Sequence, residues 1–114
     1  MEAEVDFAWI SLLQRRADYA RKTAASAPRP AVAKELEELA ALYDALMEGK
    51  IPAGAKSITS VDPKGGLIRH LQARANQYLM DARTISNKAC ADDLRYLAGV
   101  FGAEAARLKN DGVR

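Results

Sequence analysis

Residues that usually carry chemistry are rare in this chain of 114 residues, which has one cysteine and one histidine. The single cysteine, Cys90, excludes an internal disulfide, and no Cys or His stands near it at the spacing of a metal site. Every mechanism that needs a histidine, from a Ser-His-Asp triad to a Glu-x-x-His metal bundle, would depend on His70 alone. We therefore predict no catalytic residue, no metal and no cofactor, and we expect a protein that is not an enzyme.

Long apolar runs and a secretory leader are also missing from the sequence. No segment approaches the ~20 apolar residues that cross a bilayer. The acidic start, residues 1–6, lacks the basic and apolar regions of a signal peptide. A lone cysteine fits a reducing compartment, in which Cys90 would be a small buried apolar residue. We expect no membrane contact and a cytoplasmic location.

Aromatic residues make up only 6% of the chain, and the apolar 49% is dominated by Ala and Leu. That composition favours helix over sheet, and strand-like alternation of apolar and polar residues extends nowhere beyond a few residues. The length suits one hydrophobic core. We expect a single all-α domain over residues 1–114.

An internal repeat organises the sequence. When the chain is shifted by 58 residues, residues 10–47 overlie residues 68–105 without a gap, and twelve of 38 positions are identical. Both copies carry apolar residues at the alternating three and four spacing of one helix face. In the first copy these are Ile10, Leu13, Ala17, Ala20, Ala24, Val32, Leu36, Leu39, Tyr43 and Leu46. In the second they are Ile68, Leu71, Ala75, Tyr78, Ala82, Cys90, Leu94, Leu97 and Phe101, after which Glu104 breaks the stripe.

Each copy reads as helix, short turn, helix. Pro28 and Pro30 interrupt the first copy, and Pro30 suits the first turn of a helix. Ser86-Asn87 supplies N-cap side chains in the second copy. These signals predict helices over residues 7–26, 31–48, 67–84 and 88–109. Asp62-Pro63 could cap an earlier start to the third helix, although Gly65-Gly66 weakens that reading.

Residues 49–66 are rich in Gly and Pro and are predicted to link the hairpins 7–48 and 67–109. Two hairpins that pack face to face would bury both apolar stripes, which predicts a four-helix bundle. The linker permits a short return, a full crossover, or an exchange of hairpins between two chains. Its string Gly49-x-x-x-x-Gly54-Ala55-Lys56-Ser57 only faintly resembles a phosphate-binding loop, because Ala55 separates Gly from Lys and a helix precedes it.

Charged residues offer two readings. The net charge is +2, which is far from the dense basic stripe of a nucleic-acid-binding protein. Basic residues nevertheless gather on the first and third helices, and the register turns His70 toward solvent. They are Arg15, Arg16, Arg21, Lys22, Arg69, Arg74 and Arg83. We expect these side chains to pair with acidic ones on the second helix, namely Glu35, Glu37 and Glu38, or to cover apolar surface with their stems.

The two copies differ most on their outer sides. Of fifteen positions that are expected to face outward, Leu12 of the first copy among them, eight are charged in the first copy and four in the second. The loss is sharpest on the fourth helix, where two glycines stand in the helix interior at a cost of about 0.5–1 kcal/mol each. With two residues of the third helix this side is the predicted protein-contact face. Its members are Gln77, Met80, Tyr96, Gly99, Gly102, Ala103 and Ala106.

We accordingly expect a small helical protein that works by protein–protein contact, either with itself as a homodimer or with a foreign partner as an adaptor or inhibitor. One alternative is a bundle that binds a small ligand, or acts as an enzyme, in a core cavity left by the many Ala residues of the stripes. A third is weak nucleic-acid binding through the basic side of the first and third helices.

Overall fold

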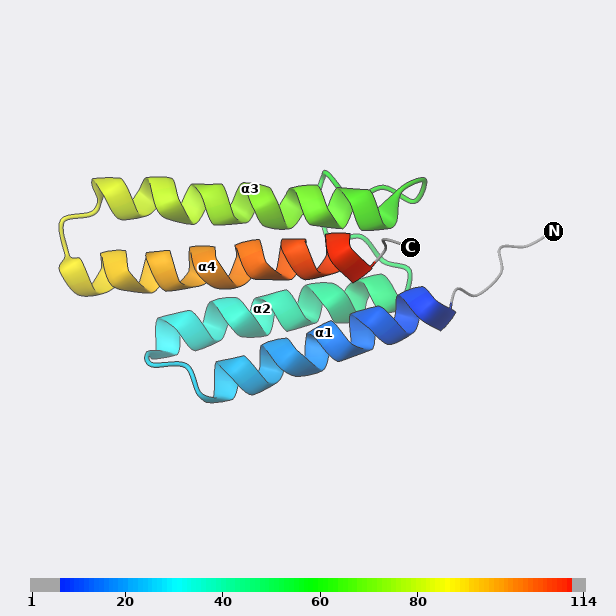
Figure 1. The fold of residues 1–114 in the computed structure, drawn as a ribbon, viewed down its shortest axis with the longest axis horizontal. Coiled ribbons are helices and arrows are strands. Elements are labelled where there is room, and N and C mark those ends of the chain that lie inside the picture. Colours follow the sequence, from blue (N-terminus) through cyan, green and yellow to red (C-terminus); the bar gives the residue numbers. More distant parts are fainter. Residues whose placement is uncertain (1–6, 112–114) are drawn as a thin grey trace. The chain divides into compact units, whose positions relative to one another are not determined.

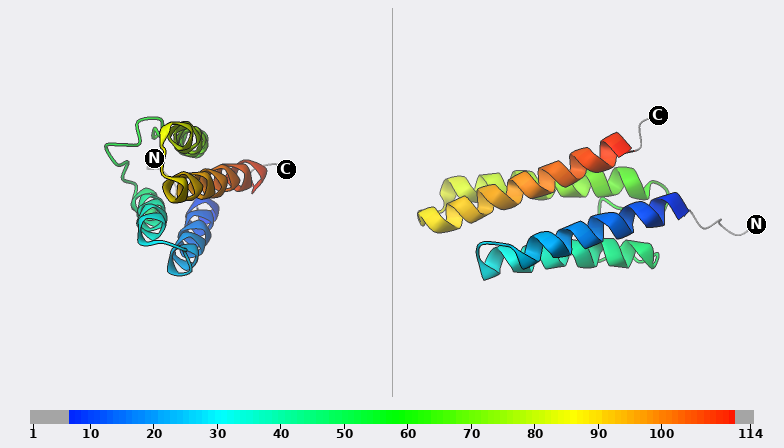
Figure 2. Two further views of the ribbon diagram at one scale, coloured as in Figure 1. Left: turned by 90° about the vertical axis from the view of Figure 1, so that its left-hand side faces the viewer. Right: turned by 60° about the horizontal axis from the view of Figure 1, so that its bottom comes forward.

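The computed structural model describes residues 7–111, and within them the chain forms four α-helices and no strand (Figure 1). The helices are α1 (Phe7–Ala25), α2 (Pro30–Met47), α3 (Pro63–Thr84) and α4 (Lys88–Asp111). Helix α1 packs against α2, and α3 packs against α4, so that each repeat is one helical hairpin (Figure 2). The all-α prediction and the two hairpins are thereby confirmed. The acidic segment 1–6 lies outside the described residues.

The chain divides into two compact units, and the boundary lies between Pro52 and Ala53. The first unit contains α1 and α2, and the second contains α3, α4 and the segment that leads into α3. Closure of the two hairpins into a single four-helix bundle, and the single domain that it would make, stay predictions.

In the first hairpin, the apolar stripe is buried as predicted. Every α2 member of the stripe is at most 7% exposed, and on α1 only Ile10 is half-buried. Leu12, which we expected to face outward, is instead 6% exposed. The prediction was wrong because the buried face of an amphipathic helix is an arc of 100° or more, which takes in both Leu12 and its neighbour Leu13.

The second hairpin is held by an aromatic pair. Tyr78 of α3 meets Phe101 of α4 edge to face, with ring centroids 5.1 Å apart. The Arg74 guanidinium lies 5.1 Å from the Tyr78 ring centroid and 5.5 Å from that of Phe101, and it donates a hydrogen bond to the Tyr78 hydroxyl. Edge-to-face pairs contribute about 0.5–1.5 kcal/mol beyond the burial of their area. The Arg74 guanidinium thus lies against the aromatic rings, whereas the sequence predicts that only the stem of this side chain covers apolar surface.

Two stripe predictions fail on α4. Cys90 is exposed, and Ala91 is buried next to it. Cys90 belongs to the first turn of the helix, where the chain arrives from the turn and the packed face is only beginning. Glu104 does not end the stripe, because it is fully buried and the stripe continues through Leu108. Its carboxylate forms an ion pair with Arg107 at 3.5 Å.

Side chains mark the starts of the second hairpin's helices. Asn87 Oδ1 accepts a hydrogen bond from the Cys90 N–H at 3.0 Å, which confirms the predicted cap of α4. Asp62 Oδ1 accepts from the Gly65 N–H at 3.1 Å and so starts α3 at Pro63, four residues before the predicted bound. In the first hairpin, α2 begins with Pro30 and has no side-chain cap.

Gly65 and Gly66, whose low helix propensity counts against this early start, in fact allow it. A Cβ at Gly65 would collide with the Asp62 carboxylate that caps the helix. A Cβ at Gly66 would collide with the Ser57 carbonyl oxygen and lie 2.7 Å from the Ile58 Cα. The segment before α3 therefore passes directly over the first turn of the helix, and its Ile58 side chain is only 3% exposed. Much of the predicted linker belongs to the second unit.

Removal of the α3 cap tests this start. Asp62→Ala leaves the Gly65 N–H without its acceptor, and we expect it to lower the free energy of unfolding by about 0.5–2 kcal/mol. Asp62→Asn keeps a capping oxygen and should lower the free energy of unfolding by no more than a few tenths of the loss in Asp62→Ala. Urea denaturation measures both values. Equal losses for Asn and Ala would show that the carboxylate acts through charge and not as a cap.

Two Gly→Ala substitutions separate packing from helix propensity. Alanine is favoured over glycine in a helix interior by about 0.5–1 kcal/mol. Gly66→Ala should nevertheless destabilise the protein by about 1–3 kcal/mol, because the new Cβ meets backbone atoms that cannot step aside. Gly99→Ala has open space within 4 Å and should stabilise it. Denaturation midpoints that shift in the same direction would contradict the close approach over Gly66.

Candidate contact surface on the second hairpin

The α4 residues of the predicted contact face lie on one side of the helix. Each of them has another member three or four residues away, from Tyr96 to Ala106, and Gly102 and Ala103 are adjacent. Tyr96 is 40% exposed, Gly99 and Ala106 are exposed, and Gly102 and Ala103 are partly exposed. We call these five residues the α4 stripe: Tyr96, Gly99, Gly102, Ala103 and Ala106. It carries no charged side chain.

The α3 members of the predicted face belong to a different surface. Met80 is 58% exposed, and Gln77 is exposed and donates to Asp81 Oδ1 of its own helix at 2.8 Å. Met80 follows Tyr78 by two residues, which is about 200° around an α-helix. Gly99 precedes Phe101 by the same interval. Since Tyr78 and Phe101 meet, Met80 and Gly99 point away from this contact on their own helices, and the structure brings together only the five α4 residues.

Nothing within the described chain requires glycine in the α4 stripe. A Cβ built at Gly99 or at Gly102 meets no atom within 4 Å. Their backbone is ordinary as well, because Gly49 is the only residue in 7–111 with a positive φ. This contrasts with Gly66, which the packing of its own unit explains. The two α4 glycines therefore lower the stability of the helix, and no packing or backbone requirement in the described chain offsets this loss.

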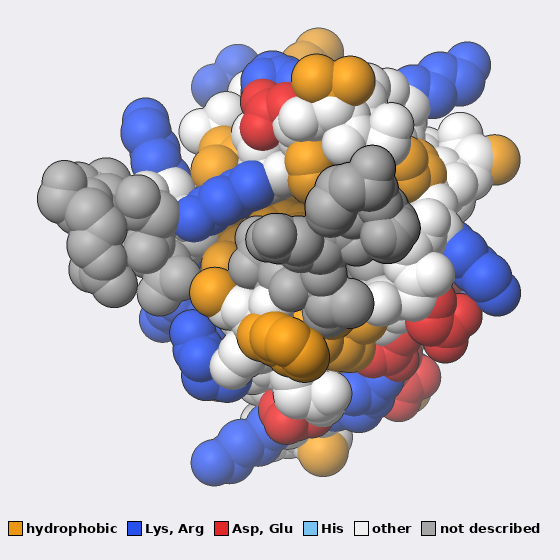
Figure 3. Space-filling model, turned by 90° about the vertical axis from the view of Figure 1, so that its right-hand side faces the viewer, with side chains coloured by type: hydrophobic (Ala, Val, Ile, Leu, Met, Phe, Trp, Pro, Cys, Tyr) orange, Lys and Arg blue, Asp and Glu red, His pale blue; other side chains and the backbone are white. Residues whose placement is uncertain are grey.

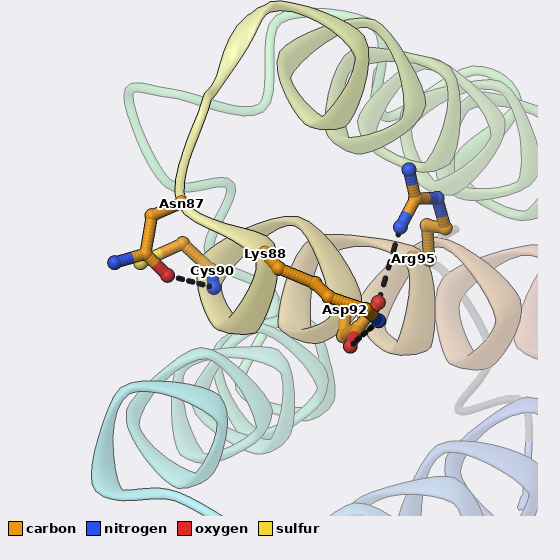
Figure 4. Close-up of polar contacts among 5 residues, drawn as sticks. All are labelled: Asn87, Lys88, Cys90, Asp92 and Arg95. Carbon is orange, nitrogen blue, oxygen red and sulfur yellow. Dashed lines mark hydrogen bonds and ion pairs between the residues drawn. The ribbon is translucent and has the colours of Figure 1, made fainter.

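A charged cluster lies on the same side of α4, one turn before the stripe (Figure 4). Asp92 accepts from Lys88 Nζ at 3.0 Å and from Arg95 at 3.1 Å. The Lys88 hydrogen bond, followed by the charges of Lys88 and Arg95, lowers the pKa of the Asp92 carboxyl, although desolvation acts against it. Asp92 therefore holds two cations at this end, while the stripe itself stays uncharged.

One basic residue of the first hairpin, Arg21, pairs with an acidic residue of α2 other than the predicted glutamates. Arg21 of α1 forms an ion pair with Asp44 of α2 and lies 3.7 Å from Asp18 of its own helix. On the face drawn in Figure 3, Lys and Arg side chains stand at several separate places, with Asp and Glu side chains near some of them. No dense basic patch appears on that face.

His70 is less exposed than its register predicts. The side chain is half-buried on α3, and burial, with a smaller contribution from the nearby Arg74 charge, lowers the pKa of the imidazole below its usual 6.5. The buried face of α3 is therefore wider than the apolar stripe, as it also is on α1 at Leu12. In the described part of the chain, no group of three or more His, Cys, Asp and Glu residues is placed to hold a metal ion.

Two exposed apolar residues near the end of α3 were not predicted. Leu79 is 43% exposed, and Ile85, which directly follows the helix, is 40% exposed. The register held the signal, since Leu79 and Met80 directly follow the buried Tyr78 and so leave the buried side of the helix. None of the helices in residues 7–111 is long and apolar enough to span a bilayer.

Comparisons with protein-family models, curated proteins and solved structures find no match to this chain. Its function is therefore inferred from its own residues and their geometry.

The lowered pKa of His70 predicts how stability depends on pH. The folded protein binds the imidazole proton less tightly than the unfolded chain does, so stability is complete above pH 6.5 and falls as the pH drops below this value. His70→Gln should remove the dependence in this window, which lies above the range where carboxylates titrate. Thermal unfolding across this range measures it. Identical pH profiles for the parent protein and the variant would contradict the shift.

Proposed function

We propose that the protein acts by protein–protein contact through the α4 stripe, with a second copy of the same chain as the favoured partner. The observation that supports this is the pair of glycines at positions 99 and 102. They lower the stability of the helix and face open space. Neither the backbone conformation nor the packing of the described chain requires glycine at these positions. A partner that approaches the α4 backbone closely would repay their cost.

Small residues change what a helix surface can bind. Helices ordinarily pack with axes about 8–10 Å apart, at a distance set by the side chains at the crossing. Gly99, Gly102 and Ala103 lower the surface of α4 at its middle, so that a second helix can lie closer and gain dispersion contacts along the backbone. Tyr96 stands beside this shallow region and presents an amphipathic ring, a residue type enriched where interfaces bind most strongly.

The size of the stripe sets the strength that we expect. Stable interfaces bury about 800 Å² on each partner. Five residues, of which two are glycine and two are alanine, offer less than this. We therefore expect a weak contact that forms at concentrations of about 10–100 µM, unless neighbouring side chains extend it.

Self-association is favoured over a foreign partner on two grounds. Two-fold homodimers are the commonest oligomers, and they bring the same patch from both chains together. An uncharged patch can meet its own copy without like-charge repulsion, whereas a charged one cannot. Binding of nucleic acid has less support, because Arg21 is already held by Asp44 and the net charge of the chain is only +2.

A charge placed in the stripe tests the proposal, and the repeat provides its control. Gly99→Glu should abolish association while the helix persists, because the new side chain enters open space and glutamate favours helix over glycine. Ala41→Glu places the same charge at the equivalent exposed position of α2, 58 residues earlier, and should leave association unchanged. Sedimentation equilibrium from about 5 to 200 µM measures the mass of each protein.

Three results would contradict the proposal. A parent protein that stays monomeric throughout the range and captures no partner would remove it. Equal loss of mass in both variants would point to a general effect of added negative charge. Unchanged mass in Gly99→Glu, with circular dichroism confirming a helical fold, would place any interface elsewhere. Ala103→Glu repeats the test one turn further along α4.

A further inference from the structure

The segment before α3 is folded against the second hairpin and is more than a linker. Ala55 is 2% exposed and Ile58 is 3% exposed, although neighbouring residues such as Ser57 are exposed. The Ile58 N–H donates to the Ala55 carbonyl at 3.1 Å, which closes a turn between the two buried side chains. The Asp62 N–H donates to Thr59 Oγ1 at 3.2 Å and joins the turn to the cap of α3. We call residues 55–61 the strap.

The strap lies over one place on α3. Gly66 is buried, and its missing side chain leaves just enough room for the backbone at Ser57 and Ile58. The residues that precede the strap have no comparable anchor: Ile51 is 42% exposed, and Gly54 has open space around it. Burial of linker side chains in the second unit therefore begins shortly after the unit boundary at Pro52 and Ala53.

We propose that the strap is a conformational element that opens and closes over the first turn of α3 while the helices stay folded. Its only buried side chains are one Ala and one Ile, which is far less apolar area than either helix buries. An element with so few buried contacts opens at a smaller free energy than the global unfolding of its unit. Opening uncovers the backbone at Gly66 and lengthens the free connection between the units from residues 51–54 to residues 51–61, since the Lys50 N–H still donates to the Ala45 carbonyl of α2.

Amide hydrogen exchange of the full chain, followed by NMR, measures this opening directly. We expect the Ile58 and Asp62 amides to be protected, but to exchange faster than the Leu71 amide in the buried middle of α3. Ile58→Ala removes the larger anchor and should speed exchange of the Asp62 amide about tenfold or more, with the rate at Leu71 almost unchanged. Ile51→Ala, which alters an exposed side chain outside the strap, should change neither rate.

Each of the other outcomes would overturn the proposal. Unprotected Ile58 and Asp62 amides would mean that the strap does not close in solution. Exchange of these amides at the rate of Leu71 would mean that the strap opens only when the whole unit unfolds. If Ile58→Ala raised the rates at Asp62 and Leu71 by the same factor, Ile58 would belong to the cooperative core of the hairpin.

Discussion

Close packing between a helix lined by small residues and a helix lined by large ones is the constraint that the first hairpin depends on. On α1 the buried stripe is mostly alanine, and on α2 it is mostly leucine with Tyr43. Alanine lets two backbones approach while the larger side chains fill the space between them, which brings a helix pair to interior density. Most helical stability in proteins comes from the packing of an amphipathic face, so the helicity of α1 and α2 depends on this contact.

The second hairpin meets the same constraint with a different set of side chains. Tyr78 takes the place of Ala20 in the repeat, so α3 projects a large ring toward α4 where α1 presents a methyl group. The structure accommodates the ring by setting it edge to face against Phe101 and by placing the Arg74 guanidinium over both. The two copies of the hairpin thus share one helix register, although their core side chains differ. That freedom also lets the outer sides of the two copies diverge.

Periodicity predicted the helices well because burial repeats every three to four residues along each of them. It failed where a position is decided by contacts outside the helix. Cys90 continues the period but is exposed while its neighbour Ala91 takes the buried position, and Leu12 lies at the edge of a buried arc wider than the stripe. The ion pair of Arg21 with Asp44 depends on how α1 is rotated against α2, which spacing along one helix cannot give. The sequence indicates Asp62 as a possible cap. Helix propensity alone counts Gly65 and Gly66 against it, because the atoms that occupy the space of their Cβ positions are known only from the fold.

Glycine is required by the packing at one pair of helix positions in this protein and is not required at another pair. At Gly65 and Gly66 the structure supplies the reason for glycine, because a side chain oxygen and a passing backbone occupy the space of a Cβ. At Gly99 and Gly102 that space is empty, and the backbone would accept any residue. A helix of 24 residues that keeps two unneeded glycines on one uncharged side loses stability without an internal gain. We propose that the missing gain comes from outside the hairpin, through a helix that lies close against α4, because glycine allows a closer approach than alanine or serine does.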